Sequence, residues 1–180
     1  AKNTNLALLS WNARGINNPR KGRRIMAYMD RHNIDIAYLQ KTYLAPGGSL
    51  MLDSRWGPHR YLASFSSYAR GVSTLIHKRI DFKRLKVYND TAGRYIIIVA
   101  IIEDHCIVMV NTYAPNTDAP SSFERCSRSW DTSVVTIIWG ADLNLVVNAE
   151  QDNSNDRSAL KPDSLQSVRL NMETFGMGDT

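Results

Sequence analysis

The hydrophobic and polar positions along the chain follow the short periods of strands more often than the longer period of helices. Apolar or alternating runs of strand length predict eight strands. These runs cover residues 6–11, 34–40, 61–66, 71–77, 82–88, 94–102, 106–113 and 134–139. Helices are expected at 20–32, 120–130 and 164–175, and a polar loop at 148–158. Many strands with few helices predict an α/β fold of two packed sheets flanked by helices.

The first predicted helix has clear signals at its start and along its length. Asn17-Asn18-Pro19 forms a turn that places Pro19 near the first helical position, where proline is well tolerated. Ile25, Met26 and Met29 fall on one face, and arginines fall on the other. We therefore expect this helix to bury one face against a sheet.

Length and composition fit one globular domain spanning residues 1–180. The longest apolar run, residues 95–102, is of strand length and too short to cross a membrane, so no membrane partner is expected. Two cysteines, Cys106 and Cys126, cannot build a disulfide framework. This composition favours a reducing, intracellular compartment. Cys106 opens an apolar strand, and we expect it to be a small core residue.

The net charge is +5, with basic residues concentrated in two groups. The first group is Arg14, Arg20, Lys21, Arg23, Arg24 and Arg31, and the second is Lys78, Arg79, Lys83, Arg84 and Lys86. Such clusters suit a polyanion, most simply nucleic acid. On charge alone, a solvated helix face and an exposed edge strand explain them equally well.

Polar residues follow four of the apolar runs at the point where each strand should end. The segments are "SWNARG" at 10–15, "LQKT" at 39–42, "NTYAPN" at 111–116 and "WGADLN" at 139–144. If these strands lie side by side, one rim of the fold collects Asn12, Lys41, Tyr113, Asp142 and Asn144. Polar groups gathered at strand ends often build a site. The alternative is four ordinary transitions from strand to loop.

Taken together and in this order, the segments resemble the exonuclease–endonuclease–phosphatase superfamily, and most closely the endonuclease domain of LINE-type (non-LTR) retrotransposons. The matching stretches are "LLSWNARGINNPRKGRRI", "IDIAYLQKTYL", "RGVSTLIHKRIDF", "VNTYAPN" and "WGADLNLVVNAEQDNS". The resemblance implies a four-layer α/β sandwich of two mixed sheets flanked by helices. It also implies cleavage of DNA phosphodiester bonds with Mg²⁺ or Mn²⁺.

The same resemblance assigns candidate roles to individual residues. Asn12 matches an asparagine at the metal and phosphate, Tyr113 a phenol on the scissile phosphate, and Asp142 the carboxylate that activates water. Asn144 matches the asparagine beside that aspartate. The expected contacts with nucleic acid are Arg14, Arg20, Lys21, Arg23 and Asn116. Hydrolysis of an anionic diester needs such donors and a cation around the phosphate.

One departure from the family affects the metal directly. Lys41 stands where the family has the glutamate that is its principal metal ligand. A charged ammonium has three donors and no lone pair, so it cannot coordinate a cation. We hypothesise that Lys41 places its ammonium near Asp142 and the asparagines, where it holds a phosphate without activating it. The alternative is that Lys41 turns out to solvent.

A second departure lies at the end of the chain, where the family has a Ser-Asp-His segment and further strands. Neither is found by Thr180, so the domain is expected to be truncated, with a sheet edge that accepts a protein partner or a second copy. The four histidines, His32, His59, His77 and His105, lie in other contexts, and we expect structural or surface roles for them.

Three functions follow from these observations. The first is a nuclear DNA-nicking endonuclease domain of a retroelement, impaired by Lys41 and by the missing histidine segment. The second is a non-catalytic pseudo-nuclease that binds nucleic acid or a protein partner. The third is a phosphatase of the same fold, which the LINE-like segments "YAPN" and "NAEQD" disfavour.

Overall fold

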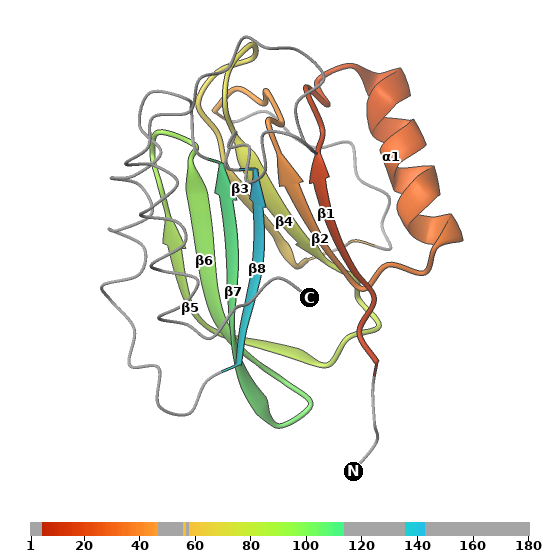
Figure 1. The fold of residues 1–180 in the computed structure, drawn as a ribbon, viewed down its shortest axis with the longest axis vertical. Helices are drawn as coiled ribbons and strands as arrows, with labels where there is room; N and C mark the ends of the chain where they lie inside the picture. The colour runs from red at the N-terminus through yellow and green to blue at the C-terminus, as the bar shows by residue number, and fades with distance from the viewer. Residues whose placement is uncertain (1–4, 47–55, 57, 114–135, 143–180) are drawn as a thin grey trace, which may run out of the picture. The chain divides into compact units, whose positions relative to one another are not determined.

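The computed structural model describes residues 5–46, 56, 58–113 and 136–142. These residues belong to one compact unit, Ala1–Tyr113 with Ser133–Asp142. Within it, the chain forms eight strands and one helix (Figure 1). In chain order they are β1 (Leu8–Asn12), α1 (Pro19–Arg31), β2 (Ile36–Gln40), β3 (Arg60–Ala63), β4 (Val72–Ile76), β5 (Phe82–Asn89), β6 (Tyr95–Ile102), β7 (His105–Tyr113) and β8 (Thr136–Asp142). The predicted helices at 120–130 and 164–175 and the loop at 148–158 lie outside the described residues.

The described strands form the two sheets that the sequence predicts, with four strands in each. The first sheet has the order β1-β2-β4-β3 and the second has the order β5-β6-β7-β8. Each sheet is mixed, because β1 runs parallel to β2 and β7 runs parallel to β8, whereas the other neighbours are antiparallel. The eight predicted strands are all present, although their bounds shift by up to three residues. The difference that matters most for the candidate site is at the end of β8. This strand continues past Trp139 and ends at Asp142.

The alternation of side chains along β2 explains how the layers pack. Ile36 and Tyr38 point into the space between the two sheets, where they meet Ile98 and Met109 of the second sheet. The residues between them, such as Leu39, point to the other face and pack against α1. Because both faces of β2 are covered, its sequence reads as a continuous apolar run rather than an alternating one.

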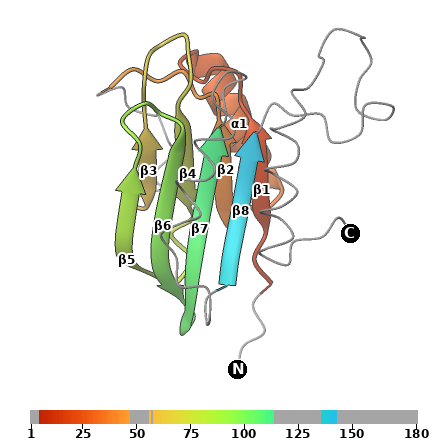
Figure 2. The same ribbon diagram turned by 60° about the vertical axis from the view of Figure 1, so that its left-hand side comes forward.

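Helix α1 covers the outer face of the first sheet (Figure 2). The Asn18 side chain accepts a hydrogen bond from the Arg20 N–H at 2.9 Å and caps the helix, with Pro19 directly after it. At the other end, Asn33 has a φ of +50°, and the Ile34 N–H donates to the Met29 carbonyl oxygen. This is a Schellman ending. The buried residues are Ile25, Met26 and Met29, which confirms the predicted apolar face.

The prediction for Cys106 was wrong, because the side chain is exposed. Ile107 and Met109 of the same strand point into the core between the sheets, so Cys106 faces the opposite side. It also lies next to the hairpin turn, where His105 is exposed as well. Among the described residues, the structure contains no helix long and apolar enough to cross a membrane.

The two sheets approach closely where β8 passes β2. A Cβ atom added to Gly140 would lie 2.5 Å from Cδ2 of the Tyr38 ring, closer than real Cβ contacts allow. Tyr38 is 2% exposed and packed within the core between the sheets. The two sheets therefore lie too close together at position 140 for any residue other than glycine.

We predict that Gly140→Ala lowers the free energy of unfolding by about 1–3 kcal/mol, because the added methyl group overpacks the core. Urea unfolding measures this loss. Gly22→Ala is the matched control, since its Cβ would meet only the Ile16 carbonyl oxygen at 3.6 Å. There, alanine should stabilise the helix by up to about 1 kcal/mol. Equal effects of the two substitutions would contradict the close approach.

Candidate active site at the strand ends

The two parallel pairs of strands place four strand ends on one rim of the molecule. The carboxyl ends of β1, β2, β7 and β8 all lie at the same end of the sandwich (Figure 1). Asn12 pairs with Gln40 at the end of the first pair, and Tyr113 pairs with Asp142 at the end of the second. Strands β1 and β8 contact each other across the two sheets (Figure 2). This arrangement brings together polar residues that lie far apart in the sequence.

Asp142 is at the centre of the group that forms on this rim. Its Oδ2 atom accepts a hydrogen bond from Asn12 Nδ2 at 2.8 Å and lies 3.1 Å from Lys41 Nζ. The Lys41 ammonium also lies 5.2 Å from the centre of the Tyr113 ring, in cation–π contact. The side chains of Lys41 and Asp142 are only 17% and 15% exposed. Lys41 therefore points inward, and the alternative in which it turns to solvent does not hold.

The backbone directs Lys41 into the site. Lys41 has a φ of +52°, and Arg14, on the neighbouring strand exit, has a φ of +46°. Such left-handed conformations cost a non-glycine residue about 1–3 kcal/mol and need support from their surroundings. Two backbone hydrogen bonds provide this support. Gly15 N–H donates to the Lys41 carbonyl oxygen at 2.7 Å, and Thr42 N–H donates to the Gly71 carbonyl oxygen at 3.0 Å. The strained exits are thereby tied to one another.

A buried pair of amides lies directly beneath the site. Gln40 Nε2 donates to Asn111 Oδ1 at 2.9 Å, and to Ser10 Oγ at 3.1 Å. Asn111 Nδ2 in turn donates to the Ser73 carbonyl oxygen at 2.9 Å. Gln40 and Asn111 are 1% and 0% exposed. These bonds join β1, β2, β4 and β7, and so hold the two sheets together immediately next to Lys41 and Tyr113.

Sequence reasoning did not assign a role to Gln40 or Asn111, although a signal for them exists. On β2 the positions facing the other sheet are Ile36, Tyr38 and then Gln40. On β7 the same face continues from Met109 to Asn111. A strand face that changes from apolar to polar while still buried indicates polar residues that must find partners.

The described residues do not fit the divalent cation that the family resemblance implies. Mg²⁺ requires several oxygen ligands in near-octahedral geometry. Asn12 Oδ1 is buried and accepts no hydrogen bond from the described part of the chain, so it would be one suitable oxygen, and Asp142 would supply another. The ammonium of Lys41 occupies the position beside that carboxylate. Within the described part of the chain, no three histidine, cysteine, aspartate or glutamate side chains form a metal-binding group.

The other predicted residues have varied surroundings. Arg14, Arg20 and Arg23 are exposed, and Lys21 Nζ donates to the Arg14 carbonyl oxygen at 2.7 Å. Asn116 and Asn144 lie outside the described residues. The histidines make the structural and surface contacts that we expected: the rings of His32, His59 and His77 lie against Tyr28, Phe82 and Trp56, and His105 Nδ1 bonds to the Glu103 carbonyl oxygen.

The two packed mixed sheets form a fold that solved structures of AP endonucleases and of TDP2 share. An AP endonuclease from Archaeoglobus fulgidus has a TM-score of 0.68 and 18% identity, over 94% of this chain and 70% of that one. AP endonuclease LMAP from Leishmania major has a TM-score of 0.66 and 15% identity, over 94% of this chain and 65% of that one.

A third neighbour is a humanized D. rerio TDP2 with 14 mutations, at a TM-score of 0.62 and 15% identity. That match covers 78% of this chain and 67% of the other. The chain thus spans about two thirds of the length of these proteins. No protein-family model matches the sequence. At these identities the likeness shows the fold alone.

We predict that Asn111→Leu and Gln40→Leu each lower the free energy of unfolding by about 1–3 kcal/mol, because each leaves a buried polar group without its partner. The double substitution should cost less than the sum of the two. The difference, measured in a double-mutant cycle by urea unfolding, should be about 0.5–3 kcal/mol. Simple additivity would show that the two amides do not stabilise each other.

Proposed function

We propose that this chain is a LINE-type endonuclease domain that has lost hydrolysis and binds nucleic-acid phosphates at the strand-end site. The observation that carries the proposal is the ion pair between Lys41 and Asp142, with Nζ and Oδ2 3.1 Å apart. The resemblance of the five sequence segments supports the LINE assignment, and the fold supports the nuclease class. A domain of this kind would act on DNA in the nucleus.

The chemistry of the ion pair favours binding over cleavage. Hydrolysis of a phosphodiester requires an activated water and a concentrated positive charge on the non-bridging oxygens. In this site the carboxylate of Asp142 is already paired with an ammonium and an amide, so it is poorly placed to act as a base. The same pairing neutralises a negative charge that would otherwise repel a phosphate. Lys41 thus makes the rim more favourable to an anion while removing the metal site.

The surrounding charges supply the attraction to a polyanion. The exposed residues Arg14, Arg20 and Arg23 lie on the exit of β1 and at the start of α1. Contacts of this type with phosphates give binding that depends steeply on salt and little on sequence. On the family resemblance, we also assign Asn116 to the nucleic-acid contacts and Asn144 to the site beside Asp142. A protein partner or a second copy at a sheet edge is a further part of the proposal.

A second candidate is metal-dependent nicking of DNA. The observation that favours it is the Asn12 Oδ1 atom, which is buried and receives no hydrogen bond among the described residues. An oxygen in this state would be satisfied by a cation. The two candidates therefore differ in a single respect, which is whether a cation can displace the Lys41 ammonium from Asp142.

We predict that Lys41→Glu creates a cation site. Without divalent cations, the new carboxylate next to Asp142 should lower the melting temperature by several degrees, since about 1 kcal/mol corresponds to roughly 2–4 °C in a protein of this size. Millimolar Mg²⁺ or Mn²⁺ should restore it, because the two carboxylates and Asn12 Oδ1 then supply oxygen ligands. The melting temperature of the unmodified chain should not respond to these cations.

Lys83→Glu is the matched control, because it makes the same charge change on β5 at an exposed position away from the site. Its melting temperature should not depend on Mg²⁺.

In a separate assay, plasmid DNA should be bound but not nicked by the unmodified chain. Nicking by that chain, or an equal rise of its melting temperature in Mg²⁺, would establish the second candidate in place of the first.

A further inference from the structure

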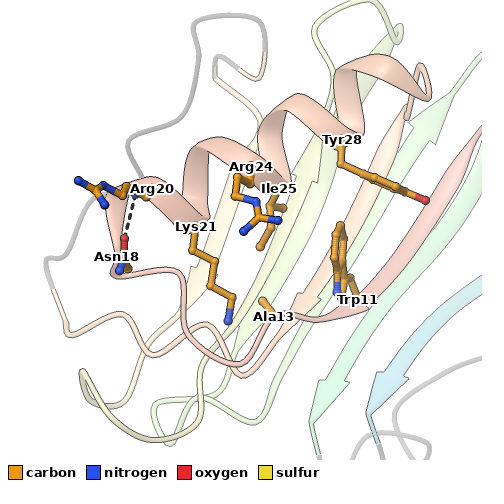
Figure 3. Close-up of a pocket in the computed structure, with 8 residues that line it drawn as sticks. All are labelled: Trp11, Ala13, Asn18, Arg20, Lys21, Arg24, Ile25 and Tyr28. Atoms are coloured by element: carbon orange, nitrogen blue, oxygen red, sulfur yellow. Dashed lines mark hydrogen bonds between the residues drawn. The ribbon is translucent and has the colours of Figure 1, made fainter.

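A surface pocket lies between α1 and β1, on the opposite face of β1 from the strand-end site. Its volume is about 530 Å³, within the usual range for small-molecule pockets. Figure 3 shows the Trp11 side chain on β1 pointing toward Tyr28 of the helix. The Lys21 side chain points toward Ala13, and Arg24 lies on the helix between Lys21 and Tyr28. Arg20 also lines the pocket, but its side chain is directed away from Trp11.

The pocket combines flat aromatic rings with positive charge. Trp11 and Tyr28 meet edge to face, with ring centres 5.0 Å apart, and Tyr28 is 41% exposed. In the described part of the chain, no residue lining the pocket is acidic, and no carboxylate forms an ion pair with Arg24. The Arg24 guanidinium is exposed and keeps its donors available. Such a lining suits a ligand that has both a planar ring and an anionic group.

The pocket is connected to the strand-end site through a single strand. Successive residues of β1 point to opposite faces, so Asn12 reaches Asp142 while Trp11 and Ala13 face α1. Lys21 Nζ donates to the Arg14 carbonyl oxygen at 2.7 Å, which ties the wall of the pocket to the exit of β1. The two sites therefore lie on either side of the end of one strand, within the reach of a nucleotide chain.

We propose that this pocket binds an unpaired nucleotide of the same nucleic acid whose phosphate occupies the strand-end site. The base would lie against Tyr28 and Trp11, and the adjoining phosphate would accept hydrogen bonds from Arg24 and Lys21. The proposal rests on the proposed function, because it needs a nucleic acid bound at the rim. It extends the proposed ligand to single-stranded DNA next to a duplex, which the strand-end residues alone would not distinguish from other DNA.

Two physical features favour a nucleotide over an acidic peptide. Tyr28 is exposed beside Trp11, with the His32 ring against it at 4.2 Å between ring centres. Stacking of a base on an aromatic side chain contributes about 1–3 kcal/mol. The cations lie at one side of these rings rather than spread along a groove, as Figure 3 shows for Lys21 and Arg24. A base and its phosphate likewise place a planar ring beside a charged group.

The test compares a blunt DNA duplex with the same duplex carrying a short single-stranded overhang, by fluorescence anisotropy. The overhang should tighten binding of the unmodified chain about tenfold, as expected for one stacked base. Tyr28→Ala and Arg24→Gln should each remove most of this gain and leave binding of the blunt duplex nearly unchanged. Both positions are exposed on α1, so the variants are expected to fold, and thermal unfolding checks this.

Arg23→Gln is the control for charge, because Arg23 is exposed and adjacent to Arg24 but does not line the pocket. It should weaken binding of the blunt and the overhang duplex alike, and so keep the full gain from the overhang. An equal loss in Arg23→Gln and Arg24→Gln would overturn the pocket in favour of general charge attraction, as would no gain in the unmodified chain. Failure of the blunt duplex itself to bind would instead overturn the proposed function.

Discussion

The hydrogen bond between Gln40 and Asn111 is the constraint on which the arrangement of the site depends. The two amides are fully buried between the sheets, and an unpaired buried amide is costly, so each sheet must present its amide opposite the other. Gln40 directly precedes Lys41, and Asn111 lies two residues before Tyr113. Any sliding of one sheet over the other would separate these groups. The bond therefore sets which strand ends meet, while the apolar contacts below it supply most of the stability.

The ion pair between Lys41 and Asp142 sets the charge of the strand-end site. Asn12, Tyr113 and Asp142 gather on one rim of the fold, and Lys41 lies among them. Its ammonium satisfies the carboxylate electrostatically, so the site stays paired and mostly buried without a cation. An ion pair of this kind does not have to add much stability to be retained, because either charge alone would be costly at such low exposure.

Strand β1 relates the strand-end site to the pocket beside α1. Its inward residues, Ser10 and Asn12, belong to the polar network between the sheets. Its outward residues, Trp11 and Ala13, pack against the helix. The contact from Lys21 to the Arg14 carbonyl oxygen closes the exit of the strand on the helix side. A ligand bound at either face would therefore lie next to the same short segment of backbone. This segment has a left-handed conformation at Arg14.

Local pattern in the sequence was enough to predict a helix at 20–32 with Pro19 near its start, eight strands and the polar residues at the strand ends, because side-chain periodicity and helix-start signals are properties of neighbouring residues. Other features depend on contacts between distant segments. Strand alternation places Lys41 on the helix side, opposite to Gln40, and only the left-handed backbone at Lys41 turns its ammonium toward Asp142. Tertiary structure likewise decided three further features. They are the exposure of Cys106, the hydrogen bond between Gln40 and Asn111, and the contact between the Trp11 and Tyr28 rings. Each depends on which faces come together, and the free energy of that choice is shared among residues far apart in the chain.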